Sequence, residues 1–313
     1  MFKIFFTTDV HGSEVCFMKF LNAAKAYKAN AIILGGDITG KMIIPLVPKA
    51  DKTYTVYGGD AIGTFEVSDV EEIKKKIMGS GYYPYIMSDQ EYDHMRTEKD
   101  ELDTLFSELM KQQVERWNNI AEERLKGTEV KCYISPGNDD RFIIDSVIGG
   151  GSSVVNPEDQ VVDIGGYEMI TSGFVPPTPW NTSRECSEEE LARKIENMTT
   201  KVQAMPKCIF NIHTPPHNSK LDEAPLLDEN LRPIQKGGSP VIAAVGSTAV
   251  RTAIEKHQPL MGLHGHIHEG RGAQKIGKTL CLNPGSEYGE AVLRGVIVNL
   301  DGAKIKSYVF TSG

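Results

Sequence analysis

Several short apolar runs in this sequence end in turns that carry side chains able to bind metal ions. The runs have the length of buried strands, and they cover residues 2–6, 31–34, 130–134, 208–212 and 260–263. Amphipathic stretches between them predict helices over residues 13–30, 98–125, 188–201 and 247–257. Further strands are expected at residues 161–164, 168–171, 280–282, 293–298 and 304–310. Strands alternating with helices favour a layered α/β domain with mixed sheets.

The polar turns follow the apolar runs in a fixed order. In chain order they contain Asp9 and His11, Asp37, Asn138 with Asp139 and Asp140, His213, and His266 with His268. Ligands of open α/β sheets bind beyond the carboxyl ends of the strands, so we expect these turns to converge on one crevice. Aspartate, asparagine and histidine together suit Mn, Fe, Zn or a similar divalent ion.

Residues 41–128 separate the second run from the third and predict an insertion within a single domain that spans residues 1–313. The insertion has a turn-rich part at residues 41–60 and a tyrosine-rich loop at residues 81–85. A helix is expected from Ser68, with Glu71 at the capping-box position, before the long helix at residues 98–125. Farther along, prolines and glycines in residues 221–240 predict a long loop.

Charge and cysteine content narrow the class of protein. The net charge of -8 gives no general attraction for nucleic acids or anionic membranes. No apolar stretch is long enough to span a membrane, and the start lacks a secretory signal, so we expect a cytoplasmic protein without a membrane partner. Five scattered cysteines without a C-x-x-C pair are typical of reduced, buried thiols. Oligomeric state is left open.

The order Asp-x-His, Gly-Asp, Gly-Asn, His, Gly-His-x-His resembles the pattern of the calcineurin-like metallophosphoesterase family. The matching residues extend from Asp9 to His268, and Asn283-Pro284-Gly285-Ser286 resembles the trailing turn of that family. The resemblance implies a four-layer α-β-β-α sandwich of two mixed sheets flanked by helices, here with a helical insertion.

The resemblance also implies a site with two divalent metal ions. Asp9, His11 and His268 would hold the first ion, Asn138, His213 and His266 the second, and Asp37 would bridge them. Mn is the favoured metal, with Fe, Zn, Co and Ni as alternatives. A hydroxide between the two ions would attack phosphorus in line with the leaving oxygen. The implied activity is that of a phosphoesterase, with diesters preferred to monoesters, acting on a small phosphate ester or a nucleotide.

One residue of the predicted catalytic set, which comprises Asp37, Asn138 and Asp139, departs from the family pattern. Asp139 stands where the family has a histidine that faces the substrate. Two nearby dications would lower the pKa of this carboxyl group, so Asp139 should be a poor proton donor. The hydrolysis of esters with good leaving groups should be slowed least by the lack of a proton donor. The alternative is a catalytically impaired metal-binding scaffold of the same fold, and a nuclease is disfavoured by the net charge.

Other polar and aromatic residues have weaker predictions attached to them. Besides Asn138, two residues are candidates for substrate binding. His217 could replace the missing proton donor, although an exposed loop position is favoured. Arg141 could pair with Asp139 or Asp140 or bind phosphate, although a solvated ion pair is favoured. His264 has no predicted role. For the tyrosines of residues 81–85 and for the face of the long helix around Trp117, packing is favoured over stacking on a substrate or forming a lid.

Overall fold

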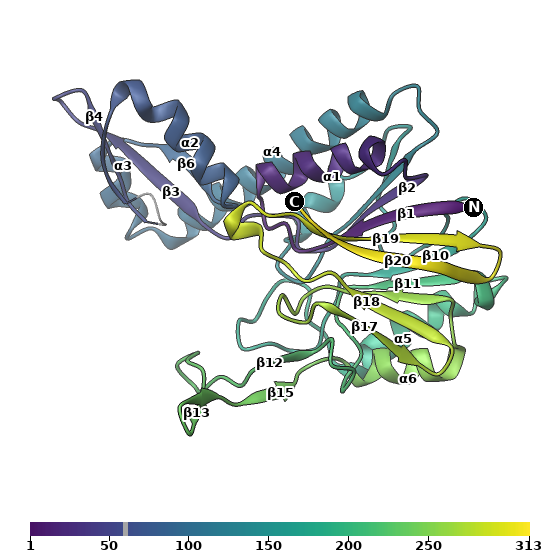
Figure 1. The fold of residues 1–313 in the computed structure, drawn as a ribbon. Coiled ribbons are helices and arrows are strands. Elements are labelled where there is room, and N and C mark those ends of the chain that lie inside the picture. The colour runs from purple at the N-terminus through teal and green to yellow at the C-terminus, as the bar shows by residue number, and fades with distance from the viewer. Residues whose placement is uncertain (59–61) are drawn as a thin grey trace.

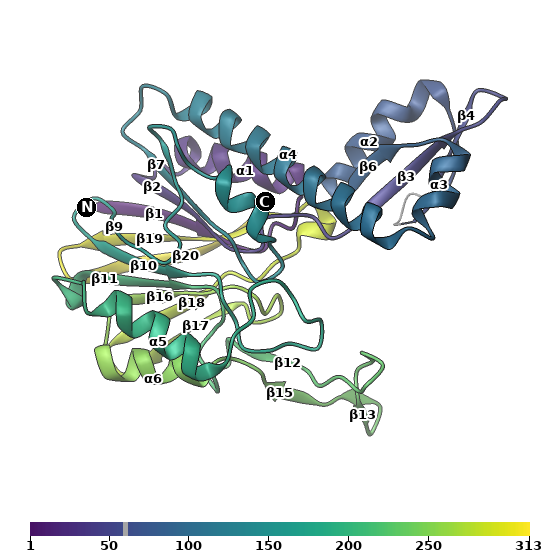
Figure 2. The same ribbon diagram turned by 180° about the vertical axis from the view of Figure 1, so that it is seen from behind.

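Two sheets face each other in the computed structural model, which describes residues 1–58 and 62–313 (Figures 1 and 2). The first sheet has the order β20 (Lys304–Ser312), β19 (Arg294–Asp301), β1 (Phe2–Thr7), β2 (Ala31–Gly35), β7 (Lys131–Ser135) and β8 (Val154–Val155). The second has the order β17 (Gly272–Ile276), β18 (Thr279–Asn283), β16 (Met261–Leu263), β11 (Cys208–Ile212), β10 (Glu168–Ser172) and β9 (Val161–Asp163). Both sheets are mixed, because parallel pairs such as β1 with β2 adjoin antiparallel pairs such as β1 with β19.

Side chains of the central strands alternate between two apolar layers. Ile4 and Phe6 of β1 lie in the cluster between the sheets, whereas Phe5 lies in the cluster under the helices. Strand β2 follows the same rule, with Ile33 between the sheets and Ile32 on the outer face. Since successive side chains of a strand point to opposite faces, a run that is apolar throughout must be buried on both sides.

Helices cover the outer face of each sheet (Figure 2). The helices α1 (Glu14–Ala26) and α4 (Lys99–Leu125) pack on the first sheet, and α5 (Glu188–Thr199) and α6 (Thr248–His257) pack on the second. Ser13, Ser187 and Ser247 cap three of these helices by accepting a backbone N–H, which satisfies donors that a helix start leaves free. The four-layer sandwich is therefore confirmed.

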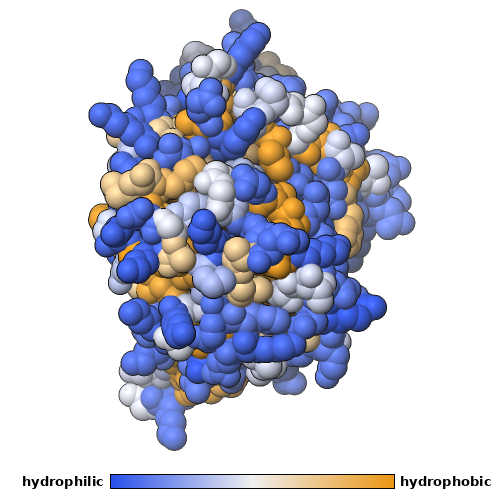
Figure 3. Space-filling view, turned by 90° about the vertical axis from the view of Figure 1, so that its right-hand side faces the viewer, coloured by the Kyte–Doolittle hydropathy of each residue, from blue (hydrophilic) through white to orange (hydrophobic). Residues whose placement is uncertain are grey.

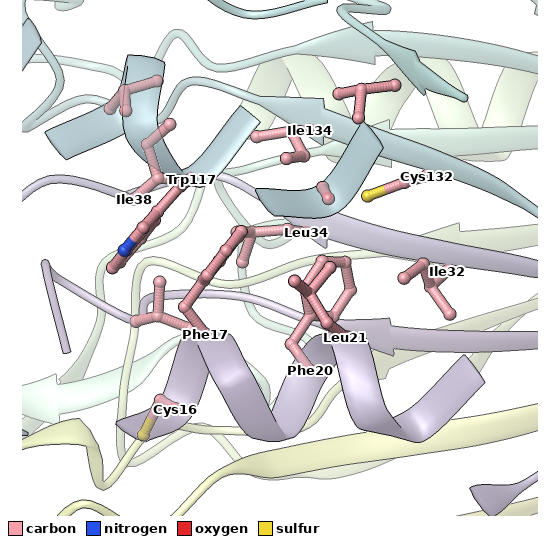
Figure 4. Close-up of a cluster of buried hydrophobic side chains, with 14 of the residues drawn as sticks. Cys16, Phe17, Phe20, Leu21, Ile32, Leu34, Ile38, Trp117, Cys132 and Ile134 are labelled. Carbon is pink, nitrogen blue, oxygen red and sulfur yellow. The ribbon is translucent and has the colours of Figure 1, made fainter. Parts of the chain in front are cut away.

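The core under α1 and α4 is shown in Figure 4. The Trp117 ring stacks on Phe17 with centroids 4.1 Å apart and an angle of 4° between the ring planes. Its Nε1–H donates to a carboxylate oxygen of Glu14 over 2.8 Å. Helix α4 is thus a packed layer of the domain, as favoured from the sequence, and its Trp117 face is not a lid.

The insertion contains a sheet that the sequence did not predict. It has the order β5 (Gly63–Glu66), β4 (Thr53–Val56), β3 (Ile43–Pro48) and β6 (Tyr83–Ile86), and the helices α2 (Val70–Gly79) and α3 (Asp89–Met95) accompany it. The insertion, predicted to be helical, therefore contains a sheet as well as helices, and the turn-rich part predicted at residues 41–60 and the loop predicted at residues 81–85 contain strands. Residues 59 and 60 of that part lie outside the described residues. Isoleucine, valine, threonine and tyrosine favour strands, and the prolines beside them masked the signal.

The capping box predicted at Ser68 is also wrong. Helix α2 begins at Val70 after a 3-10 turn, and Asp69 precedes it without a side-chain cap. A full capping box lies instead at Ser88, where the Ser88 hydroxyl accepts from the N–H of Glu91 and the Glu91 carboxylate accepts from the N–H of Ser88.

This difference gives a matched pair of variants. Ser88→Ala should lower the free energy of unfolding by about 1 kcal/mol, because it removes the acceptor of a capping bond. Ser68→Ala should change it by less than about 0.5 kcal/mol, since the Ser68 hydroxyl only donates to the neighbouring Asp69. Urea unfolding of the two variants measures both values, and equal losses would contradict the assignment of the cap.

Short strands form an arm on the second half of the chain, within and just beyond the predicted long loop. They pair as β12 (Glu223–Pro225) with β15 (Ile242–Ala244) and β13 (Gln235–Lys236) with β14 (Ser239–Pro240). Short 3-10 turns complete the chain at η2 (Val67–Asp69), η3 (Phe142–Ser146), η4 (Met205–Lys207) and η5 (Tyr288–Glu290). The arm and the insertion both project from the same end of the sandwich (Figure 1).

The other end of the sandwich, where β1 begins, is seen in Figure 3. Hydrophilic residues cover most of this face, and hydrophobic residues occupy smaller areas between them. Among the described residues, no helix has the length and apolar character needed to cross a membrane.

Candidate metal centre

The turns with metal-ligating side chains meet at one end of the two sheets. Strands β1, β2 and β7 run parallel in the first sheet, and β11 and β16 run parallel in the second. Each polar turn directly follows one of these strands, and three overlapping groups of side chains come together from them. The ligating atoms of each group lie within 4.8 Å of one another. The expected convergence is therefore present in the structure.

The first group consists of Asp9, His11 and His268. The Nε2 atoms of His11 and His268 are 3.0 Å apart, and His268 Nε2 lies 3.5 Å from Asp9 Oδ1. Both imidazoles thus present the same nitrogen to one carboxylate. Two neutral imidazoles and a carboxylate are a donor set that suits a divalent transition metal.

The second group consists of Asp37, His213 and His266. His213 Nε2 lies 3.3 Å from Asp37 Oδ2 and 3.7 Å from Asp9 Oδ1. Asp37 Oδ2 also lies 3.7 Å from His11 Nε2 of the first group. Asp37 is therefore the carboxylate that lies between the two groups.

Asn138 approaches the same place with its amide held in one orientation. Its Nδ2 donates to Thr182 Oγ1 over 3.0 Å and to Asp139 Oδ1 over 3.1 Å. The buried Asn138 Oδ1 has no hydrogen-bond partner among the described residues. A buried acceptor without a partner is unfavourable, and a cation would satisfy this atom. Sequence reasoning missed Thr182, which lies 44 residues from Asn138.

Four of these residues have a left-handed backbone, which is rare for residues other than glycine. Their φ angles are 52° for Asp9, 39° for His11, 50° for Asp37 and 65° for His266. Bonds between turns hold this conformation, including Asp9 N–H to Gly36 O and His11 N–H to Asp37 O. Such strain persists only where the surroundings enforce it, and it clusters at functional sites.

Two glycines allow the turns to approach each other. A Cβ atom on Gly36 would lie 2.3 Å from His213 Nδ1, and one on Gly265 would lie 2.4 Å from Asp9 Oδ2. The turn of residues 283–286 forms hydrogen bonds to two of the ligand-bearing turns. Asn283 Nδ2 donates to Ile267 O, and the Ser286 hydroxyl donates to Asp9 O.

The whole chain can be superposed on solved structures of similar architecture. The protein TT1561 of Thermus thermophilus matches 99% of this chain and 97% of its own, with a TM-score of 0.54 and 14% identity. Another solved chain matches over 97% of both chains, with a TM-score of 0.57 and 14% identity. Together with two mixed sheets whose ligand-bearing turns meet at one edge, this decides the fold. The chain shares the fold of these structures, which is the four-layer sandwich implied by its resemblance to the calcineurin-like metallophosphoesterases.

Comparison of sequences finds a relative that matches only part of the chain. The uncharacterized protein MJ1162 of Methanocaldococcus jannaschii is 32% identical over 160 residues, which are 50% of this chain and 63% of that protein. The match thus spans less than two thirds of this relative. No protein-family model matches the chain.

Charges within the ligand cluster are arranged to receive a cation. Burial would raise the pKa of Asp9 and of Asp37, but the nearby histidines outweigh it and hold both carboxyls well below the usual range. Burial would lower the pKa of His213, yet Asp37 and Asp9 raise it to about 10. Two buried carboxylates therefore hold a proton on a buried imidazole, and a metal ion can supply the same positive charge.

Asp139 has a partner that the sequence did not indicate. Lys41 Nζ lies 3.1 Å from Asp139 Oδ2, and the side chain of Asp139 also lies beside His11. Burial and the charge of Asp37 raise the pKa of Asp139 to about 6 in the metal-free protein, against the effect of Lys41. Lys41 sits at the start of the insertion, where no motif marked it.

Two polar residues near the cluster have partners other than those considered from the sequence. Arg141 pairs with Asp103 through both terminal nitrogens, so the pairing with Asp139 or Asp140 is wrong. Asp140 is buried and accepts hydrogen bonds from the N–H groups of Ile38, Thr39 and Gly137. It therefore joins the turn after β2 to the turn after β7.

A cavity adjoins the cluster and is lined by Asp37, Asn138, His266 and His268, among other residues, but not by His217 or His264. His217 is 41% exposed and lies 3.8 Å from Asp222, which agrees with the favoured exposed position. His264 is buried, its Nδ1 contacts Ile212 O at 2.8 Å, and burial lowers its pKa to about 4. His264 is therefore a neutral core histidine that joins β16 to β11.

Proposed function

We propose that this protein is a metal-dependent phosphoesterase that prefers diesters to monoesters. The observation that carries the proposal is the cluster itself: carboxylates and imidazoles from distant parts of the chain form groups whose ligating atoms lie within 4.8 Å of one another, and the buried Asn138 Oδ1 lacks a partner among the described residues. A small phosphate ester or a nucleotide is the proposed substrate class.

The donor set fits two divalent ions. In this proposal Asp9, His11 and His268 hold one ion, Asn138, His213 and His266 hold the other, and Asp37 contributes to both. When bound, such ions neutralise phosphoryl charge and activate water for attack on phosphorus. Mn is the favoured metal, since oxygen and imidazole ligands are mixed here.

The chain supplies charge of its own beside the cluster. Lys41 and Asp139 line the same cavity as Asp37, Asn138 and His268. The Lys41 ammonium group is placed to donate hydrogen bonds to a phosphoryl oxygen, which is favourable where negative charge develops. The Asp139 carboxylate repels a second negative charge on the substrate. A diester carries one charge and a monoester up to two, so the pair favours the diester.

Residues 41–128 are proposed to be an insertion within one domain of residues 1–313. Its sheet has a separate apolar cluster that includes Ile44, Leu46 and Val56. Helix α4, by contrast, packs on the core of the first sheet.

The proposal is tested with bis(p-nitrophenyl) phosphate and p-nitrophenyl phosphate in the presence of Mn²⁺, after removal of metal by chelation. We expect turnover that depends on added Mn²⁺ and a higher kcat/KM for the diester. Isothermal titration calorimetry should show two Mn²⁺ ions bound per chain. Bound metal without turnover of either ester would support the impaired scaffold instead.

Replacement of Lys41 tests the role of its charge. Lys41→Met should lower kcat/KM for the diester by about 10²-fold, the usual effect of losing one donor to a developing oxyanion. Lys49→Met is the matched control, because Lys49 pairs with Asp89 within the insertion. A twofold or smaller loss in Lys41→Met, measured at saturating Mn²⁺, would contradict the assignment.

A further inference from the structure

We propose that the cavity beside the metal-ligand cluster binds a large apolar substituent of the substrate, so that the substrate is an amphiphilic phosphodiester. The proposal rests on the phosphoesterase function proposed above and names the chemical class of ester. An amphiphilic diester here means a phosphate with one polar phosphoryl group and at least one bulky aryl or alkyl group.

The cavity joins the cluster directly and is large. Its volume is about 960 Å³, and one end is lined by Asp37, Asn138, His266 and His268. Ligand cavities typically measure about 300–1,000 Å³, so this one is at the upper end. A phosphoryl group at the cluster would leave most of the space for the rest of the molecule.

The other walls are mainly apolar and come from three separate parts of the chain. They belong to α4, to the loop of residues 176–183 and to the arm. The apolar side chains on these walls include Phe106 and Met110 of α4, Pro177 and Trp180 of the loop, and Leu226 and Val245 in and beside the arm. An apolar group held between these walls would be removed from water, which is favourable in proportion to the area buried.

Several of these side chains are exposed to solvent. The exposed fraction is 59% for Trp180, 43% for Val245 and 40% for Leu226. A single exposed apolar residue is ordinary, but a group that lines one cavity marks a binding site. The occupant is fixed by continuity with the cluster, because an apolar group attached to phosphate is what reaches both ends.

The Trp180 loop is tied to the proposed metal ligand Asn138. The Thr178 and Thr182 hydroxyls both donate to Glu185 Oε1, at 2.6 Å and 2.8 Å. Thr182 accepts from Asn138 Nδ2, and Thr178 accepts from the Trp180 N–H. The apolar wall and the ligand cluster are therefore held in one hydrogen-bonded unit, which fixes the position of one relative to the other.

The test compares three diesters that share the p-nitrophenyl leaving group and differ in the second ester group: methyl, hexyl or phenyl. In each case water adds to phosphorus, the P–O bond to the nitrophenyl group breaks, and nitrophenolate leaves with the bonding electrons. Intrinsic reactivity is therefore similar across the series. We expect kcat/KM to be at least tenfold higher for the hexyl or the phenyl ester than for the methyl ester, mainly through a lower KM. The better of the two identifies an alkyl or an aryl group.

Two variants of the apolar wall locate the effect. Trp180→Ala and Leu226→Ala should each reduce the ratio of kcat/KM between the preferred ester and the methyl ester by at least threefold. Val309→Ala is the matched control, since Val309 is 56% exposed on β20 and does not line this cavity. It should leave the ratio unchanged. A ratio that falls equally in all three variants would overturn the assignment of the wall.

A binding measurement with an ester analogue distinguishes a missing apolar site from a missing phosphoesterase activity. Hexyl methylphosphonate carries the same hexyl group and has no ester that the assay detects. In Mn²⁺-loaded protein it should shift the fluorescence of Trp180 to shorter wavelength, while dimethyl phosphate should not. Trp117, the other tryptophan, is buried. Hydrolysis of all three esters at similar rates without such a shift would overturn the inference and leave the phosphoesterase intact. Absence of hydrolysis together with the shift would overturn the enzyme and retain the amphiphile site.

Discussion

Asp37→Ala should lower kcat/KM for bis(p-nitrophenyl) phosphate by more than about 10²-fold. Loss of residues that only support a ligand typically reduces metal affinity or activity by about 10–100-fold, and Asp37 is placed between both ligand groups. Its Oδ2 lies 3.3 Å from His213 Nε2 and 3.7 Å from His11 Nε2. Its Oδ1 accepts the N–H of Asp139 over 2.9 Å. The variant therefore loses a proposed ligand of both ions and a bond between two turns.

Asp159→Ala provides the control for this loss. Asp159 is an exposed aspartate that pairs with Lys194 on the surface, so its replacement should leave kcat/KM within about twofold of the original protein. Calorimetry should detect fewer than two Mn²⁺ ions bound by Asp37→Ala, and a thermal unfolding curve checks that the variant is folded. Full activity with two ions bound would refute the proposed bridging position.

Trp117→Ala should lower the free energy of unfolding by about 3–5 kcal/mol, the usual loss when a buried tryptophan is truncated. Trp117 is 2% exposed, stacks on Phe17 and donates to Glu14. The variant leaves a cavity between α1 and α4 and a carboxylate without one of its donors. Urea unfolding followed by circular dichroism measures the loss.

The two tryptophans of the chain form a matched pair for this experiment. Trp180→Ala should change the free energy of unfolding by less than about 0.5 kcal/mol, because Trp180 is 59% exposed. Similar losses in both variants would show that α4 is not a packed layer of the domain.

The sandwich could be predicted from the sequence because its central strands are buried on both faces. The runs at residues 31–34 and 208–212 consist of apolar side chains that are buried on both faces of the sheet, except for Asn211, which is polar and also buried. Glycine stands directly beside the ligating residue in several of the turns, as Gly36 beside Asp37, Gly137 beside Asn138 and Gly265 beside His266. Since parallel strands end at a common edge, sequence order alone places Asp9, Asp37 and His213 near one another.

The insertion and the surroundings of the cluster could not be predicted in the same way. Strand β3 has prolines at two of its six positions, so its local preference contradicts its pairing with β4 and β6. Lys41 and Thr182 act on Asp139 and Asn138 through contacts between residues far apart in the chain, and no periodic pattern marks such contacts. Arg141 reaches Asp103 on α4, which depends on the packing of a helix whose direction the sequence does not give.

The left-handed backbone at four ligand-bearing positions has a consequence for metal loading. Each such residue holds about 1–3 kcal/mol of conformational strain. Folding of the chain compensates for this strain before any ion binds. The turns are thus preorganised: an ion finds its donors in place and need not induce them. Affinity then depends mainly on the exchange of water and protons for the cation, and substitutions that relax these backbones would weaken capture even with every donor atom retained.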